Sequence, residues 1–298
     1  SIYIGNNLFL DEGIFVTGNN ELVMQSGSTV SGGSATSYVN GNMRKFLPAA
    51  TLNALFEIGD QNFYTPAEIT FTGTILGAGS ILARTDQGDH ASIYLSGINE
   101  TKSCNRTWTL TPTAVSGYTA VSVKLNFNAA DLDVSSNPLM FNGARYSGSA
   151  WTLAGSASAQ SSYTQLSGLT GLGSFQVGEP VNGIIWTGSV NTVWNNASNW
   201  LPNSIPGSTD NVIIGLVPNQ PNLSTGLNGA GKDLTMYAGT SITIGSGKIL
   251  DLHGTINATN SSINGLGTLK LNSSAGTLTG NLIVGSNLTV ASGAILSM

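Results

Sequence analysis

Residues 241–256 read SITIGSGKILDLHGTI, in which short apolar segments alternate with glycine and small polar residues. Gly245, Gly247 and Gly254 separate these segments. Glycine adopts positive φ values at little cost, so it suits tight corners between short strands. Short strands joined by tight corners are typical of a parallel β-solenoid, in which each coil stacks on the next. The stretch therefore predicts solenoid coils.

The same pattern occurs in two separate parts of the chain. It fills residues 1–36 and returns in residues 181–298, so we expect solenoid coils in both. The second region opens with Trp186, Trp194 and Trp200, and the prolines that follow favour an irregular cap. Large aromatic side chains bury extensive apolar area, so we expect these tryptophans to fill the junction with the preceding region. The alternative is that their faces form a platform for sugar rings.

Residues 37–180 show a different pattern. Residues 121–127 read VSVKLNF and alternate between apolar and polar side chains, which predicts a half-buried β-strand. The pairs Asn40-Gly41 and Asn142-Gly143 favour two-residue hairpin turns. Repeated alternating strands without a convincing helix indicate an antiparallel sandwich. The sequence therefore predicts an all-β fold, an antiparallel immunoglobulin-like β-sandwich flanked by parallel β-solenoid segments, with domains at 1–36, 37–180 and 181–298.

The charge content excludes several classes of protein. Asp, Glu, Lys and Arg make up 8% of the 298 residues, against roughly 25% in an average soluble domain. Ten basic and fifteen acidic residues give a net charge of −5, and no Lys/Arg cluster is present to neutralise phosphates, so we expect no nucleic-acid partner. No apolar run is long enough for a membrane span, and none is expected. The single cysteine, Cys104, excludes an intrachain disulfide and is interpreted as a small buried hydrophobe.

The sequence offers no convincing catalytic, cofactor or metal site. Hydrolysis needs convergent carboxylates or a nucleophile with a base, and the acidic residues here are scattered. The most polar cluster contains Asp86, Asp89 and His90, which is a conceivable cation site, although its spacing matches neither an EF-hand nor a zinc site. A solvated loop is the favoured interpretation of this cluster. His253 has no evident partner in the sequence. We therefore expect no catalytic residues, no cofactor, no bound metal and no enzymatic activity.

The two ends of the chain resemble each other. Residues 2–16 read IYIGNNLFLDEGIFV and residues 282–296 read LIVGSNLTVASGAIL, and they align without gaps at an offset of 282 − 2 = 280. One interpretation is that all solenoid coils resemble one another. The other is that the chain is one unit of a tandem array. Because an uncapped coil exposes unpaired backbone groups and apolar side chains, we expect further copies to cover both ends, as a covalent array or as head-to-tail subunits.

Three further motifs carry a resemblance to a known group of proteins. They are Tyr38-Val39-Asn40-Gly41-x-Met43-Arg44-Lys45 with Phe56-x-Ile58-Gly59-Asp60, then Arg145-Tyr146 with Trp151, and finally Trp186-x-Gly188 with Trp194 and Asn199-Trp200. Together they resemble the repetitive modules of giant cell-surface, adhesin-like proteins of the Bacteroidota. The resemblance implies an extracellular protein exported by the type 9 secretion pathway, although the sorting domain of that family is absent from these residues.

These observations favour one function and leave two alternatives. The leading interpretation is an extracellular structural or adhesive repeat of a large bacterial surface protein or fibre. The second is a carbohydrate-binding module that recognises surface glycans. The third is a solenoid enzyme that degrades polysaccharides, which would need charged side chains along one solenoid face; residues 252–298 contain one, Lys270.

Overall fold

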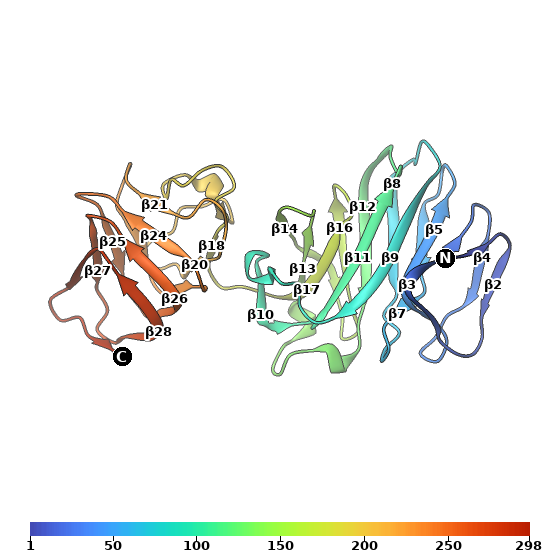
Figure 1. The fold of residues 1–298 in the computed structure, drawn as a ribbon, viewed down its shortest axis with the longest axis horizontal. Coiled ribbons are helices and arrows are strands. Elements are labelled where there is room, and N and C mark those ends of the chain that lie inside the picture. Colours follow the sequence, from blue (N-terminus) through green and yellow to red (C-terminus); the bar gives the residue numbers. More distant parts are fainter. The chain divides into compact units, whose positions relative to one another are not determined.

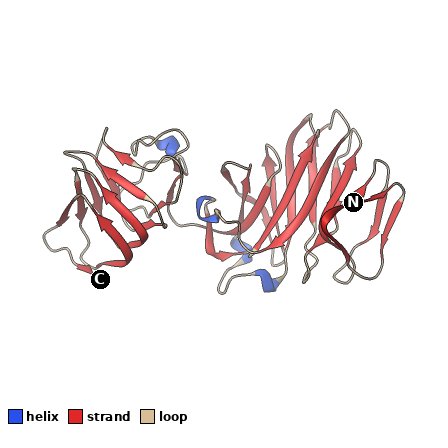
Figure 2. Cartoon of the chain, in the orientation of Figure 1, coloured by secondary structure: helices blue, strands red, loops and turns tan.

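The computed structural model describes residues 1–298 and is an all-β structure that contains a β-solenoid, with 54% of its residues in strands and no α-helix. The chain separates into two compact units, Ser1–Val181 and Asn182–Met298, which are described separately (Figure 1). Four short 3-10 turns, blue in Figure 2, interrupt the strands: η1 (Ile93–Leu95), η2 (Ala129–Asp131), η3 (Pro138–Met140) and η4 (Ala197–Asn199). No helix is long and apolar enough to cross a membrane.

The first unit begins with solenoid coils. Strands β1 (Ile2–Ile4), β2 (Asn7–Leu10), β3 (Phe15–Met24) and β4 (Thr29–Gly32) form these coils. Strand β1 pairs in parallel with β3, and β2 pairs in parallel with β4. The coils continue into the next region, because β3 also pairs in parallel with β5 (Val39–Leu47).

Most of the later strands of the first unit pair antiparallel. The later strands are β6 (Asn53–Phe56), β7 (Ile58–Gly59), β8 (Ala67–Gly73), β9 (Gly79–Gln87), β10 (Ile98–Ser103), β11 (Arg106–Thr113), β12 (Tyr118–Asn126), β13 (Asn142–Tyr146), β14 (Trp151–Ala154), β15 (Ser156–Ala159), β16 (Tyr163–Leu169) and β17 (Ser174–Pro180). Among them, β7 pairs in parallel with β5. One sheet has the order β1-β3-β5-β9-β11-β17-β13-β14, with β7 beside β5 and β10 beside β17. A second sheet has the order β15-β16-β12-β8-β6.

One hydrophobic core joins both sheets and the N-terminal coils. It includes Ile69 from β8, Trp108 from β11 and Leu22 from β3. The alternation at 121–127 is confirmed, because Val121 and Val123 are fully buried on β12 and Phe127 follows with 5% exposure. The coils of residues 1–36 and the strands that follow them therefore share a single core within one compact unit.

The two Asn-Gly pairs do not form hairpin turns, so that prediction was wrong. Asn40-Gly41 lies inside β5, and Asn142-Gly143 opens β13. Gly41 has a φ of 115°, beside a shift in the register between β3 and β5. The Thr17 hydroxyl there accepts a hydrogen bond from the backbone N–H of Asn42, at 2.8 Å. The positive φ of glycine thus serves a bulge within a strand, which the dipeptide alone does not distinguish from a turn.

The second unit is a parallel β-solenoid, as predicted. Its strands are β18 (Ile184–Trp186), β19 (Trp200–Leu201), β20 (Val212–Ile214), β21 (Asn222–Leu223), β22 (Gly229–Gly231), β23 (Leu234–Met236), β24 (Ser241–Ile244), β25 (Ile249–Leu252), β26 (Ile256–Asn264), β27 (Thr268–Leu271), β28 (Gly276–Val284), β29 (Asn287–Val290) and β30 (Leu296–Ser297). All its strand pairs are parallel except β18 with β19.

The coils of this unit repeat at regular spacing. Val212 pairs with Leu234, Leu234 with Ile256, and Ile256 with Leu278, so the sequence advances by 234 − 212 = 22 residues for each coil along this face. The inward aliphatic side chains stack into a separate core. The sequence predicted the solenoid from inward aliphatic side chains and small residues at the corners.

Candidate functional site

The three tryptophans of the second unit are inside its core. Trp186 and Trp194 are fully buried, and Trp200 is 3% exposed. The Trp200 ring lies edge-on to both, with centroid distances of 4.8 Å to Trp186 and 4.7 Å to Trp194. Because their faces are covered, these rings do not form a platform for sugars. They pack with Val212 and Ile214 and fill the first coils of the solenoid.

The side chains of Asp86, Asp89 and His90 have separate partners. Asp86 pairs with Arg84 at 3.0 Å, and both are about half exposed. The Asp89 carboxylate accepts a hydrogen bond from Gln176. His90 accepts the backbone N–H of Ser92 at Nδ1, at 3.2 Å. No group of three or more His, Cys, Asp or Glu side chains is arranged to hold a metal ion.

Asp89 lies in an unusual electrostatic environment. Its Oδ1 accepts the Ser103 hydroxyl at 3.1 Å, and the same hydroxyl lies 3.2 Å from Oδ2 of Asp133. The pKa of Asp89 is raised to about 6, mainly by burial and also by the negative charges of Asp133 and Glu100, against the hydrogen bond from Ser103, which lowers it. The carboxyl of Asp89 is therefore half protonated at about pH 6.

His90 belongs to a partly exposed aromatic cluster. Its ring centroid lies 4.6 Å from that of Tyr146 and 5.0 Å from that of Trp151. Tyr146 and Trp151 lie 5.2 Å apart, and the Trp151 indole N–H donates to the Ser92 hydroxyl at 3.0 Å. Burial lowers the pKa of His90, which favours the neutral imidazole in this cluster.

A buried ionic cluster surrounds Arg106 and was not predicted from the sequence. This arginine is fully buried and donates to Asp131, Asp60 and the Thr85 hydroxyl. The signal was present in the alternation, because residue 106 has the same parity as Trp108 and Leu110, which face the core. A lone arginine in phase with core residues predicts a buried partner, and Asp131 is that partner.

The remaining candidates are structural. Cys104 is buried, as expected, and burial raises the pKa of its thiol well above the ordinary value, so the reactive thiolate is disfavoured. His253 follows β25, and its Nε2 lies 3.6 Å from an oxygen of Asp251.

The first and last coils share several strand limits and a corner glycine. Strand β2 (Asn7–Leu10) and strand β29 (Asn287–Val290) begin and end at equivalent positions for the offset of 287 − 7 = 280. Strands β1 and β28 end at the equivalent residues Ile4 and Val284. The corner glycines Gly13 and Gly293 have φ values of 87° and 78°. We call residues 2–16 the first rung and residues 282–296 the last rung.

The two rungs differ in which side is covered. The first rung is covered by the coil that follows it, since Ile2 pairs with Leu22 and Asn7 with Thr29. The last rung is covered by the coils that precede it, since Val284 pairs with Ile263. The side that is open in one rung is covered in the other.

Apolar side chains are exposed on both rungs. On the last rung, Leu288 is 50% exposed and Val290 is 49% exposed, although Leu269 and Leu271, their partners in the preceding coil, are buried. On the first rung, Ile2 is 52% exposed, and a hollow of about 190 Å³ lies beside it. The two rungs are the candidate functional surfaces of the chain.

Comparisons with known proteins concern mainly the second unit. A family described as "Domain of unknown function (DUF8693)" matches residues 185–293, which run from β18 to beyond β29. No curated protein and no solved structure matches the chain significantly. The solenoid unit is thus similar to a recurring domain.

Proposed function

We propose that this chain is an extracellular structural or adhesive repeat of a large bacterial surface protein or fibre, in which copies stack head to tail. The equivalence of the first and last rungs is the observation that supports the proposal. Strands β2 and β29 have equivalent limits, β1 and β28 end at equivalent residues, and both rungs have a corner glycine at the same position, while opposite sides are covered. In the first rung, the side equivalent to the open side of the last rung is covered by the coil that follows it. A similar coil could therefore cover the last rung.

The coils next to the two rungs differ from them, which argues against the interpretation that all solenoid coils resemble one another. Gly5 of the first rung lies beside Gln25, and Gly285 of the last rung lies beside Asn264. A side chain added at either glycine would meet the neighbour's amide oxygen at 3.0 Å or 2.9 Å. The adjacent coils thus have amide residues at this position, so the glycine distinguishes these two rungs from the coils beside them.

Stacking would also stabilise the exposed groups. Open strand edges present unpaired N–H and C=O groups that pair readily with another strand. Covering Leu288, Val290 and Ile2 would remove apolar surface from water, at about 25 cal/mol per Å². Head-to-tail contacts between unlike ends build filaments when the rotation from one copy to the next does not close into a ring.

Self-association of residues 1–298 tests the stacking. We expect sedimentation velocity to show association that increases with concentration, and Leu288→Lys with Val290→Lys to abolish it. Leu266→Lys is the matched control, because Leu266 is 79% exposed between β26 and β27, outside the last rung. A wild type that stays monomeric at high concentration, or a control that behaves like the double variant, would contradict the proposal. The mass of the native polypeptide after boiling in detergent then distinguishes a covalent array from separate subunits.

The proposal includes the remaining expectations from the sequence. The antiparallel ladders and shared core of residues 37–180 support a two-sheet sandwich, and we propose its immunoglobulin-like character. The resemblance to surface-protein modules supports the extracellular location and type 9 export. We further propose that the chain is not an enzyme, which assays on plant, algal and host polysaccharides would test.

A second candidate function is glycan binding. The partly exposed pair Tyr146 and Trp151 favours it, since aromatic faces stack on sugar rings. A glycan array probed with the wild type and with Trp151→Ala tests this function. Binding that is lost in the variant supports it, whereas binding that is unchanged, or absent from both, contradicts it.

A further inference from the structure

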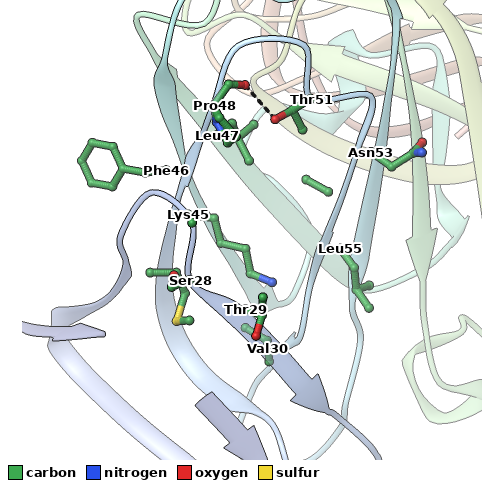
Figure 3. Close-up of a pocket in the computed structure, with 13 residues that line it drawn as sticks. Ser28, Thr29, Val30, Lys45, Phe46, Leu47, Pro48, Thr51, Asn53 and Leu55 are labelled. Atoms are coloured by element: carbon green, nitrogen blue, oxygen red, sulfur yellow. Dashed lines mark hydrogen bonds between the residues drawn. The ribbon is translucent and has the colours of Figure 1, made fainter. Parts of the chain in front are cut away.

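A groove of about 390 Å³ lies on the first unit, between two strands that are distant in sequence (Figure 3). One wall is formed by Ser28, Thr29 and Val30, around the start of β4. The other wall is formed by residues 53–55 of β6. Lys45, Phe46 and Leu47 of β5 also line the groove.

Both walls are edge strands. Strand β4 pairs with β2 alone, and β6 pairs with β8 alone, at the end of its sheet. An edge strand has N–H and C=O groups on one side without a strand partner, and such edges readily accept another strand. Here two edges face one groove.

The ladder pattern identifies the backbone groups that face the groove. On β4, the N–H of Thr29 donates to Asn6 at 3.0 Å, and the N–H of Gly33 donates to Leu10 at 3.2 Å. Alternate residues of a strand direct their polar groups to opposite sides, so the N–H and C=O of Val30 point away from β2. Val30 itself lines the groove.

The same reasoning applies to β6. The N–H of Phe71, on β8, donates to the C=O of Leu52 at 2.8 Å, and Ala54 is paired with Ile69. The even-numbered residues of this segment therefore bond to β8, and Asn53 and Leu55 direct their N–H and C=O groups away from it. Both residues line the groove.

The side chains of the groove define the chemistry of an occupant. Lys45 is the only charged residue that lines it. Its ammonium donates to Glu57 at 2.6 Å, which uses one of its three N–H donors. Phe46 and Leu55 are 43% and 39% exposed and offer apolar contacts. An occupant with apolar side chains and one acidic side chain complements this surface.

We propose that the groove binds an extended peptide segment as an additional β-strand between β4 and β6, with a carboxylate directed at Lys45. The segment hydrogen-bonds to Val30 on one side and to Asn53 and Leu55 on the other. Four residues of such a strand span about 13 Å. This binding is independent of the stacking of copies, so either proposal can fail alone.

A synthetic hexapeptide, acetyl-Thr-Val-Glu-Val-Thr-Val-amide, is the probe. Hydrogen exchange followed by NMR reports on the proposed contacts. In the free chain we expect the amides of Val30, Asn53 and Leu55 to exchange rapidly, and with the peptide we expect exchange to slow at least about tenfold. Amides that are already protected in the free chain, or that stay unprotected at saturating peptide, would overturn the proposal.

Methylated peptides test whether both edges take part. N-methylation of the odd-numbered residues removes the donors on one side of the added strand, and N-methylation of the even-numbered residues removes those on the other. Each change should weaken binding about tenfold or more. If neither pattern matters, the peptide does not bind as a strand between the two edges. If only one of the two methylation patterns weakens binding, the peptide pairs with a single edge strand, and the proposal of a strand between β4 and β6 is overturned.

Two further comparisons test the groove itself. Replacing the peptide's Glu by Gln and then by Lys should weaken binding in that order. Leu55→Pro removes one N–H that faces the groove and should weaken binding about tenfold, because proline is tolerated where the N–H points away from the sheet. Leu52→Ala is the control, since Leu52 is 57% exposed and does not line the groove. If Leu55→Pro fails to fold, the methylated peptides still decide the question.

Discussion

Arg106 and Asp131 form a bidentate ion pair inside the first unit, with Nε and Nη2 of the arginine 2.9 Å and 2.8 Å from the two carboxylate oxygens. Both side chains are fully buried, and the same Nη2 donates to Asp60 at 2.9 Å. A buried charge is tolerated only when it is paired and hydrogen-bonded. The pair therefore holds strand β11 and the turns at Asp60 and Asp131 in one fixed arrangement.

Removing the charge of Asp131 should destabilise the first unit strongly. We expect Asp131→Asn to lower the free energy of unfolding by about 3–5 kcal/mol, because a buried arginine loses its main partner. Urea denaturation measures the change. Asp86→Asn is the matched control at the half-exposed pair with Arg84, where we expect less than about 1 kcal/mol. Equal effects of the two substitutions would show that burial does not decide the strength of the Arg106 pair.

The local pattern of the sequence was enough to predict the solenoid and the β12 strand. Apolar periodicity depends on neighbouring residues, so residues 241–256 and 121–127 indicate their own structure. Partners distant in sequence were not predictable in this way. Asp131 meets Arg106, and β4 approaches β6, only because the chain folds back on itself.

The roles of individual residue types were predicted less well. Trp186 was expected to be buried at the junction with the preceding region, and the structure instead buries it in the core of the solenoid unit. Asn40-Gly41 favours positive φ in a turn and in a bulge alike, so the dipeptide could not distinguish them. Of the candidate surfaces, the two rungs were predictable from their sequence similarity, and the groove was not.

The stability of the first unit should depend on the protonation of Asp89. Its pKa is raised to about 6 in the folded chain, from about 3.9 in an unfolded chain. The folded state therefore binds the proton more tightly, so the stabilisation is complete below about pH 4 and is lost as the pH rises through 6. We expect Asp89→Asn to remove this contribution and to be more stable than the wild type at pH 7–8. Urea denaturation at a series of pH values gives the difference, and identical pH profiles would contradict the prediction.

Trp186→Ala should lower the free energy of unfolding by about 3–5 kcal/mol, because a fully buried large ring is removed. Thermal unfolding of this variant measures the loss, and a loss below about 1 kcal/mol would contradict the burial of the ring.

The indole N–H groups of Trp194 and Trp200 should contribute unequally to the stability of the second unit. The Trp200 N–H donates to the C=O of Trp194 at 2.8 Å, whereas the buried Trp194 N–H has no partner. Trp200→Phe leaves a buried C=O without its partner, so it should cost about 1–3 kcal/mol more than Trp194→Phe. Thermal unfolding of the two phenylalanine variants checks this order, and the reverse order would refute it.

Substitutions at two solenoid glycines with similar φ values should distinguish the cost of backbone strain from the cost of a steric clash. Gly247 has a φ of 72° with open space around it, and Gly280 has a φ of 85°. A side chain at Gly280 would collide with the backbone C=O of Ala258 in the preceding coil. We expect Gly247→Ala to cost about 1–2 kcal/mol from the left-handed conformation alone. Gly280→Ala should cost clearly more, because backbone atoms of a stacked coil cannot move aside without breaking the parallel ladder between β26 and β28. Chemical denaturation of both variants gives the comparison. Equal losses would mean that the coils can separate at this corner, and that stacking in the solenoid is looser than the contact with Ala258 implies.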